Sequence, residues 1–179
     1  MYALIILAVA AFAAVWGFRR GLARQTPALI GTAFGIVSAR ILGPGLFDVL
    51  YNTFTSPHGH VEQNFVYFSF ANGIIFLVIF SVFAFVTAFL GKALKRDDRT
   101  ILDNLGGGLY ALFNALLITS LLLNMLLSID LHSGLLKAAK SDDGNIVTEV
   151  MLISPALLGG DDVEDLEHEV QLEEAKKIS

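Results

Sequence analysis

Several side chains in this sequence are of types that bind metals, but their spacing gives weak support for a metal site. His58 and His60 have the spacing of two ligands on one side of an extended strand, yet two histidines alone do not complete a tetrahedral zinc site. His168 lies among glutamates in a segment that we expect to be solvated. Cysteine is absent, which removes thiol chemistry and cysteine-ligated zinc. We therefore expect neither a metal nor a cofactor.

Known catalytic motifs are also missing. Gly106, Gly107 and Gly108 resemble the start of a phosphate-binding loop, but the Gly-Lys-Ser/Thr that completes such a loop does not follow. The sequence has neither a Gly-x-Ser-x-Gly nor a His-Glu-x-x-His pattern, and no pair of carboxylates is held on a rigid element. We interpret the three glycines as helix-packing residues and expect no catalytic residues, so the protein is predicted not to be an enzyme.

Arg40 is the one charged side chain inside the long apolar stretches of the sequence. It is a candidate functional residue, because a charge in lipid is costly. One interpretation is an anchor whose long side chain reaches the outer headgroups near Asp48. The other is a charge that faces an internal cavity or a partner. Neutral polar residues accompany it in these stretches: Asn72, Asn114, Thr119, Ser120 and Asn124.

The composition places these residues in an integral membrane protein. Hydrophobic types make up 55% of the 179 residues, and charged types make up 16%, against about 25% in soluble domains. A soluble domain of this size could not bury so much apolar surface. The net charge of −5 and the mean hydropathy of +0.66 exclude a disordered chain and a nucleic-acid-binding surface. The lipid bilayer is therefore the first expected partner.

The predicted fold is all-α, with a polytopic four-helix transmembrane domain over residues 1–130. A helix needs about 20 apolar residues to cross a bilayer core of about 30 Å. Apolar stretches that reach this length, the first with the help of its flanks, predict spans at about 1–18, 26–47, 65–91 and 104–129.

The C-terminal part of the chain differs from this domain. Residues 131–160 are predicted to form an amphipathic segment on the membrane surface, with Ile146, Val150 and Ser154 at helical spacing. Residues 161–179 carry eight acidic side chains against two lysines and are predicted to form a solvated, acidic helical tail. Such a tail is a candidate partner-binding segment.

Lys and Arg predict the orientation of the spans. They occur in the first and third connections, whereas the middle connection has none. The positive-inside rule places the two basic connections in the cytoplasm. The N-terminus and the acidic tail are then expected outside, in the periplasm of a bacterium.

Small residues at regular spacing predict close helix packing. Gly31, Gly35, Ala39 and Gly43 follow one another at four-residue intervals in the second span, a pattern that lets helix backbones approach in lipid. We interpret this seam as packing within the bundle. The alternative is an interface between copies in a homo-oligomer.

Two stretches resemble motifs of the colicin V production protein (CvpA) family. The first, residues 17–25, contains an Arg-Gly pair followed by a second basic residue and a polar residue; the second, residues 102–109, opens the last span. The matching positions are Arg20, Gly21 and Arg24 in the first stretch and Asp103 and Gly106 in the second. Asn104 stands where the family often has arginine. The resemblance covers roughly residues 1–155.

The resemblance implies a multi-pass protein of the bacterial inner membrane that is needed for colicin V, or bacteriocin, production or export and for envelope processes. It implies no particular molecular activity. We therefore expect a non-enzymatic membrane scaffold or accessory protein with envelope or export proteins as partners. The alternative is a subunit of a small homo-oligomeric channel or transporter, which the glycine seam and Arg40 would suit.

Both motifs fall at the predicted cytoplasmic ends of helices. Arg20 and Arg24 would therefore lie near Asp103, with Asp97 and Asp98 nearby. We expect the two cytoplasmic connections to pair electrostatically and hold the first two spans against the last two.

Overall fold

The computed structural model describes residues 2–54, 61–93, 100–129 and 145–159. In these ranges the regular structure is helical, without strands. The elements are α1 (Tyr2–Arg20), the short 3-10 helix η1 (Ala23–Gln25), α2 (Thr26–Phe54), α3 (Val61–Ala93), α4 (Ile101–Ile129) and α6 (Asn145–Leu158). The predicted fold class is confirmed. The acidic helix expected over residues 161–179 lies outside the described residues.

Four helices, α1 to α4, are long and apolar enough to cross a membrane. α2 has 29 residues and α3 has 33, so both extend past the predicted spans at 26–47 and 65–91. At 1.5 Å per residue such helices are longer than a hydrocarbon core of about 30 Å. Tilt, or ends that protrude from the hydrocarbon, accommodates the extra length.

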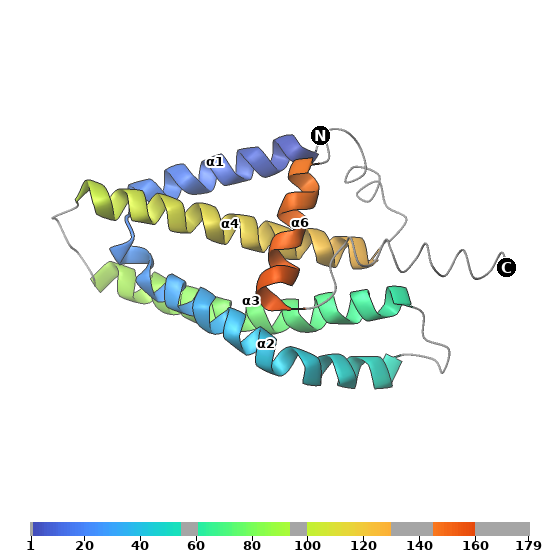
Figure 1. Ribbon diagram of the computed structural model, residues 1–179. Helices are drawn as coiled ribbons and strands as arrows, with labels where there is room; N and C mark the ends of the chain where they lie inside the picture. Colours follow the sequence, from blue (N-terminus) through green and yellow to red (C-terminus); the bar gives the residue numbers. More distant parts are fainter. Residues whose placement is uncertain (1, 55–60, 94–99, 130–144, 160–179) are drawn as a thin grey trace.

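The four long helices form two antiparallel pairs (Figure 1). α1 packs along α4, and α2 packs along α3, while contacts between the two pairs are much fewer. The first of the four helices therefore packs against the last, and the two central helices pack against each other.

Small residues allow the helices of each pair to approach closely. In α2, a Cβ added at Gly31 would collide with Phe83 of α3, one at Gly35 would lie 2.8 Å from the Phe76 ring, and one at Gly43 would collide with the Asn72 amide. Ala39 of the same seam is fully buried. The seam thus faces α3 of the same chain.

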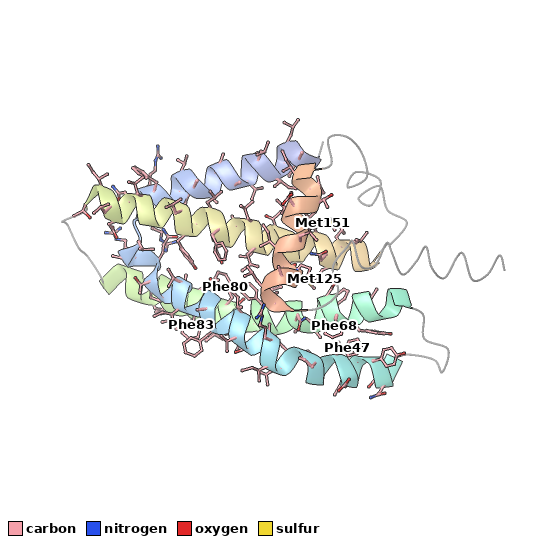
Figure 2. All side chains as sticks on the ribbon, viewed as in Figure 1. Phe47, Phe68, Phe80, Phe83, Met125 and Met151 are labelled. Atoms are coloured by element: carbon pink, nitrogen blue, oxygen red, sulfur yellow. The ribbon has the colours of Figure 1, made fainter. Side chains whose placement is uncertain are left out.

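Aromatic side chains fill the remaining space between α2 and α3. The rings of Phe34 and Phe83 stack with their centroids 5.7 Å apart, and those of Phe47 and Phe68 stack at 4.3 Å (Figure 2). Offset stacking of this kind adds to the burial of apolar area. The glycines and the phenylalanines of this pair are therefore complementary in size.

α6 runs across the bundle and connects the two pairs (Figure 1). One apolar cluster joins its residues Val147, Val150 and Met151 to Ile6 of α1 and Leu127 of α4. A second cluster joins Leu158 at the other end of α6 to residues of α2, α3 and α4. The apolar side of α6 is therefore buried against protein.

Candidate functional site

Polar groups of side chains and of the main chain gather in two places where helices meet. We call the first the motif junction, made by Gly17, Gly21, Gln25, Asp103 and Gly107, where the end of α1 meets the start of α4. We call the second the α6 junction, made by Arg40, Asn72, Ser120 and Asn124 around the C-terminal half of α6. A cleft lies between the helix pairs.

The motif junction begins where α1 ends. Gly21 has a φ of +77°, a left-handed conformation that glycine adopts without steric cost. Its N–H donates to the carbonyl of Gly17 at 2.9 Å. The turn directs the next main-chain amides toward α4: Leu22 N donates to the main-chain oxygen of Asp103 at 2.9 Å, and Ala23 N donates to Asp103 Oδ1 at 2.8 Å.

The first turn of α4 holds Asp103 in place. Thr100 Oγ1 accepts a hydrogen bond from the main-chain N–H of Asp103 at 3.2 Å, as an N-cap residue does for the third residue of a helix. A carboxylate in the first turn also interacts favourably with the positive end of the helix dipole. Asp103 therefore stabilises the start of α4 and also accepts hydrogen bonds from the residues that follow α1.

Gln25 completes the motif junction from η1. Its side chain is buried, and Nε2 lies within 3.2 Å of the carbonyl oxygens of Gly17, Gly21 and Gly107. The Gly17 carbonyl already accepts from Gly21 N, so Gln25 adds a second donor there and connects the end of α1 to Gly107 of α4. Gln25 was not among the predicted site residues, although a polar residue after the second basic residue of the motif was a signal for it.

Gly107 is required at the crossing of α1 and α4, where backbone atoms approach it. A Cβ added at Gly107 would lie 2.6 Å from the carbonyl oxygen of Gly17, and one at Gly106 would lie 3.0 Å from Leu22 Cδ2. This is the close packing that we predicted for the glycine run. The motif residues Gly21, Asp103 and Gly106 therefore lie together.

The expected pairing of Arg20 and Arg24 with Asp103 is not found, and the other acidic residues of that connection, Asp97 and Asp98, lie outside the described residues. Neither Arg20 nor Arg24 makes an ion pair with Asp103 in the part of the chain that the structure describes. The reason is the turn at Gly21, which brings main-chain amides rather than arginine side chains to the carboxylate. Arg20 instead lines the cleft between the helix pairs.

In the α6 junction, Arg40 of α2 binds the C-terminal end of α6. Nε donates to the carbonyl oxygen of Leu157 at 2.7 Å, and Nη2 donates to that of Ala156 at 2.8 Å. The last carbonyls of a helix have no intrahelical donors, and a cation there interacts favourably with the helix dipole. The charge of Arg40 is thus directed at another helix of its own chain.

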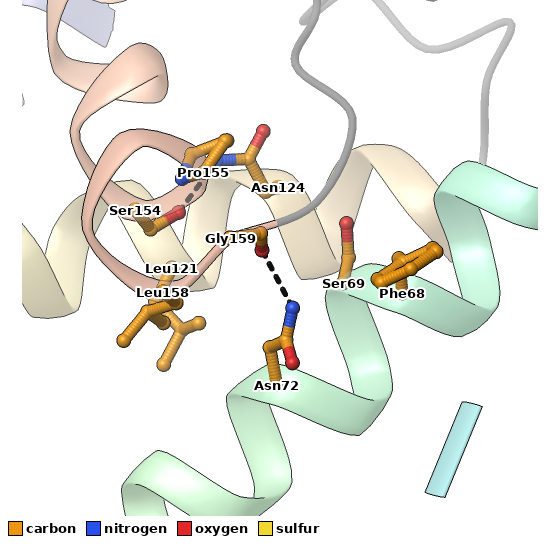
Figure 3. A pocket seen from close by; sticks show the side chains of 9 residues that line it. All are labelled: Phe68, Ser69, Asn72, Leu121, Asn124, Ser154, Pro155, Leu158 and Gly159. Carbon is orange, nitrogen blue, oxygen red and sulfur yellow. Dashed lines mark hydrogen bonds between the residues drawn. The ribbon is translucent and has the colours of Figure 1, made fainter. Parts of the chain in front are cut away.

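Pro155 accounts for the presence of polar side chains where α4 packs against α6. Proline has no N–H, so the Met151 carbonyl one turn earlier loses its helical donor. Asn124 Nδ2 and Ser120 Oγ donate to that carbonyl at 2.8 and 3.0 Å. Ser120 Oγ also accepts from Ser154 N at 2.8 Å, and Asn124 Nδ2 donates to Ser154 Oγ at 2.9 Å (Figure 3).

Asn72 of α3 binds the residue that follows α6. Its Nδ2 donates to the carbonyl oxygen of Gly159 (Figure 3), at 2.6 Å. Gly159 has a φ of +82°, and its N–H donates to the Pro155 carbonyl at 2.8 Å, which ends the helix. A cavity of about 20 Å³ lies beside these residues. α2, α3 and α4 thus each contribute polar groups to one end of α6.

The lateral cleft lies between the α1–α4 pair and the α2–α3 pair and has a volume of about 490 Å³. Its walls come from all four long helices and η1: Phe12, Ala13, Trp16, Arg20, Gln25, Ala28, Phe80, Ala84, Tyr110, Ala111, Asn114, Ala115 and Ile118. Beside the cleft, the buried Thr32 Oγ1 lies 3.0 Å from Oη of Tyr110 and Oδ1 of Asn114, which line it. These bonds connect α2 to α4 across the two pairs.

The structure shows no metal site in the residues it describes, where no three His, Asp or Glu side chains are grouped. The predicted weak ligands His58 and His60, and also His168, lie outside those residues.

Four membrane-spanning helices and the absence of strands in the described ranges define a polytopic α-helical membrane protein. A family model described as "Colicin V production protein" matches residues 2–141. The chain therefore belongs to the colicin V production protein family, as its motifs predicted. The match includes both halves of the motif junction and ends before α6. Comparisons with curated proteins and with solved structures found no match.

Proposed function

We propose that this protein is a non-enzymatic accessory protein of the bacterial inner membrane that supports colicin V or related bacteriocin production or export. It acts as a scaffold that holds envelope or export proteins through its helix faces and its acidic tail. Membership of the colicin V production protein family supports the process. The scaffold role is supported by the polar side chains, which form hydrogen bonds between helices of the same chain.

The proposal rests on one observation: the glycine seam and Arg40, which would suit a channel, make their contacts within this chain. The seam of Gly31, Gly35 and Gly43 packs against α3, and Arg40 binds the end of α6. A homo-oligomeric channel built on that seam would need it at the surface of the monomer. Internal use of the seam favours the scaffold over the channel.

The polar groups of the two junctions favour a structural role for the same reason. Gln25, Asn72, Ser120 and Asn124 all donate to main-chain carbonyls of another element. Hydrogen bonds of this kind hold helices together in lipid. Because these four side chains are used to hold helices together, they favour a structural role over an enzymatic one.

The proposal is tested by complementation in a bacterium that secretes colicin V and lacks its own family member. This chain is expected to restore toxin secretion. Gly107→Ala, which disturbs the motif junction, is expected to restore it poorly, whereas Gly45→Ala, where an added Cβ meets nothing within 4 Å, is expected to restore it fully. Both variants are compared at equal amounts in the membrane.

A flux assay separates the scaffold from the channel. The purified protein in liposomes is expected to leave the bilayer impermeable to small ions and solutes. Solute flux that Arg40→Ala abolishes would contradict the scaffold and support the alternative of a channel or transporter subunit.

A further inference from the structure

The lateral cleft opens sideways between the two helix pairs. Phe12 and Trp16 line it from α1, yet they remain 69% and 59% exposed. Phe80 of α3 and Ile118 of α4 line it from within the bundle. In a membrane-spanning bundle, a side opening of this kind faces lipid, and its apolar walls suit a hydrocarbon chain.

Two hydrogen-bond donors that line the cleft have no partner among the described residues. Arg20 stands at the end of α1 and makes no hydrogen bond or ion pair in the described part of the chain. Asn114 uses Oδ1 to accept from Thr32, and its Nδ2 has no hydrogen-bond partner among the described residues. A guanidinium and an amide nitrogen only donate. Among the residues that the structure describes, no acidic side chain lines the cleft.

From this combination we propose that the lateral cleft binds an anionic phospholipid of the surrounding bilayer. Its phosphate pairs with Arg20, and an acyl chain lies against Phe12, Trp16, Phe80 and Ile118.

Two features identify the occupant as a lipid rather than a soluble anion. Arg20 is the last residue of the first membrane-spanning helix, the level at which headgroups lie. The cleft volume of about 490 Å³ is that of a ligand site, and most of its wall is apolar, which a free phosphate would not use. Charge complementarity then selects an anionic headgroup, since arginine binds phosphate through paired N–H donors.

Trp16 provides the test, because it is the single tryptophan of the chain and lies in the wall of the cleft. The full-length protein is reconstituted in phosphatidylcholine vesicles that contain either dibrominated phosphatidylglycerol or dibrominated phosphatidylcholine. Bromine quenches tryptophan emission on contact. The wild type is expected to prefer phosphatidylglycerol by about fivefold, the effect of one basic residue at an anionic surface.

Matched variants separate the cleft from general surface charge. Arg20→Ala is expected to lower the preference to about one, and Arg20→Lys to retain part of it. Arg24→Ala removes an arginine from the same turn that does not line the cleft, and is expected to leave the preference unchanged. Ala84→Phe fills the cleft and is expected to reduce it. Thermal melting confirms that each variant is folded.

Three results would overturn the proposal. One is equal quenching of the wild type by both brominated lipids. Another is an Arg24→Ala effect as large as that of Arg20→Ala, which would show a general surface charge. The third is loss of the preference on addition of inorganic phosphate, which would show a site for a soluble anion. The outcome does not depend on toxin secretion, so it can fail while the proposed function holds.

Discussion

Asp103 shows how one side chain serves two helices at once. It is the third residue of α4, where Thr100 caps the helix, and its oxygens accept from Leu22 and Ala23 beyond α1. The contact needs an acceptor in the right place more than it needs a negative charge. Gly21 contributes the left-handed turn that points both amides at it.

This distinction predicts the effect of two substitutions. Asp103→Asn keeps an oxygen at the position of Oδ1 and is expected to leave the melting temperature in detergent nearly unchanged. Asp103→Leu leaves the Ala23 N–H without its partner, a loss of about 1 kcal/mol, which corresponds to a decrease of about 3 °C.

Arg20→Glu provides the control, because Arg20 does not pair with Asp103. Its melting temperature is expected to stay close to that of the wild type. A large decrease in the melting temperature of Arg20→Glu, reversed by the second substitution Asp103→Lys, would contradict the structure. It would support the electrostatic pairing of these two residues.

At the scale of elements, α6 depends on residues of three other helices. Pro155 frees a carbonyl inside α6, and Ser120 and Asn124 of α4 supply its donors. Arg40 and Asn72 supply donors for the carbonyls at its end. A helix of 14 residues is marginal on its own in water, so these contacts and its buried apolar side hold it across the bundle.

Arg40→Met is therefore expected to loosen α6 without unfolding the bundle. The two lost hydrogen bonds are worth about 1 kcal/mol together, at about 0.6 kcal/mol each. Hydrogen exchange of the amides in Asn145–Leu158 is expected to increase about fivefold, since 1.4 kcal/mol corresponds to a factor of ten. Amides in the middle of α3 are expected to keep their exchange rates.

The comparison is with Arg24→Met, which removes an arginine that makes no hydrogen bond in the described residues. Exchange in α6 is expected to stay unchanged in that variant. Equal exchange in α6 for Arg40→Met and the wild type would show that apolar packing alone holds the helix.

At the scale of the whole molecule, the helical class followed from the sequence, because long uncharged stretches in a bilayer have few alternatives to a helix. The pairing of α1 with α4 did not, since hydropathy carries no information on which helix lies beside which. The partner of Arg40 could not be predicted either. Ala156 lies 116 residues further along the chain, and no local pattern in the sequence indicates that these two residues meet. The motifs drew attention to Asp103 but did not indicate that its partners are the main-chain amides of Leu22 and Ala23.

The orientation of the molecule is the remaining whole-chain prediction. The basic residues next to the end of α1 and the start of α4 predict that these ends lie in the cytoplasm, and the acidic tail with Ser179 is then expected outside. The natural chain has no cysteine, so single cysteines report accessibility directly. With the outer membrane permeabilised, an impermeant maleimide is expected to label Ser179→Cys in whole cells and to label Thr100→Cys only after the inner membrane is opened. The cysteine-free chain is the control. The reverse labelling pattern would place the motif junction outside and contradict the positive-inside assignment.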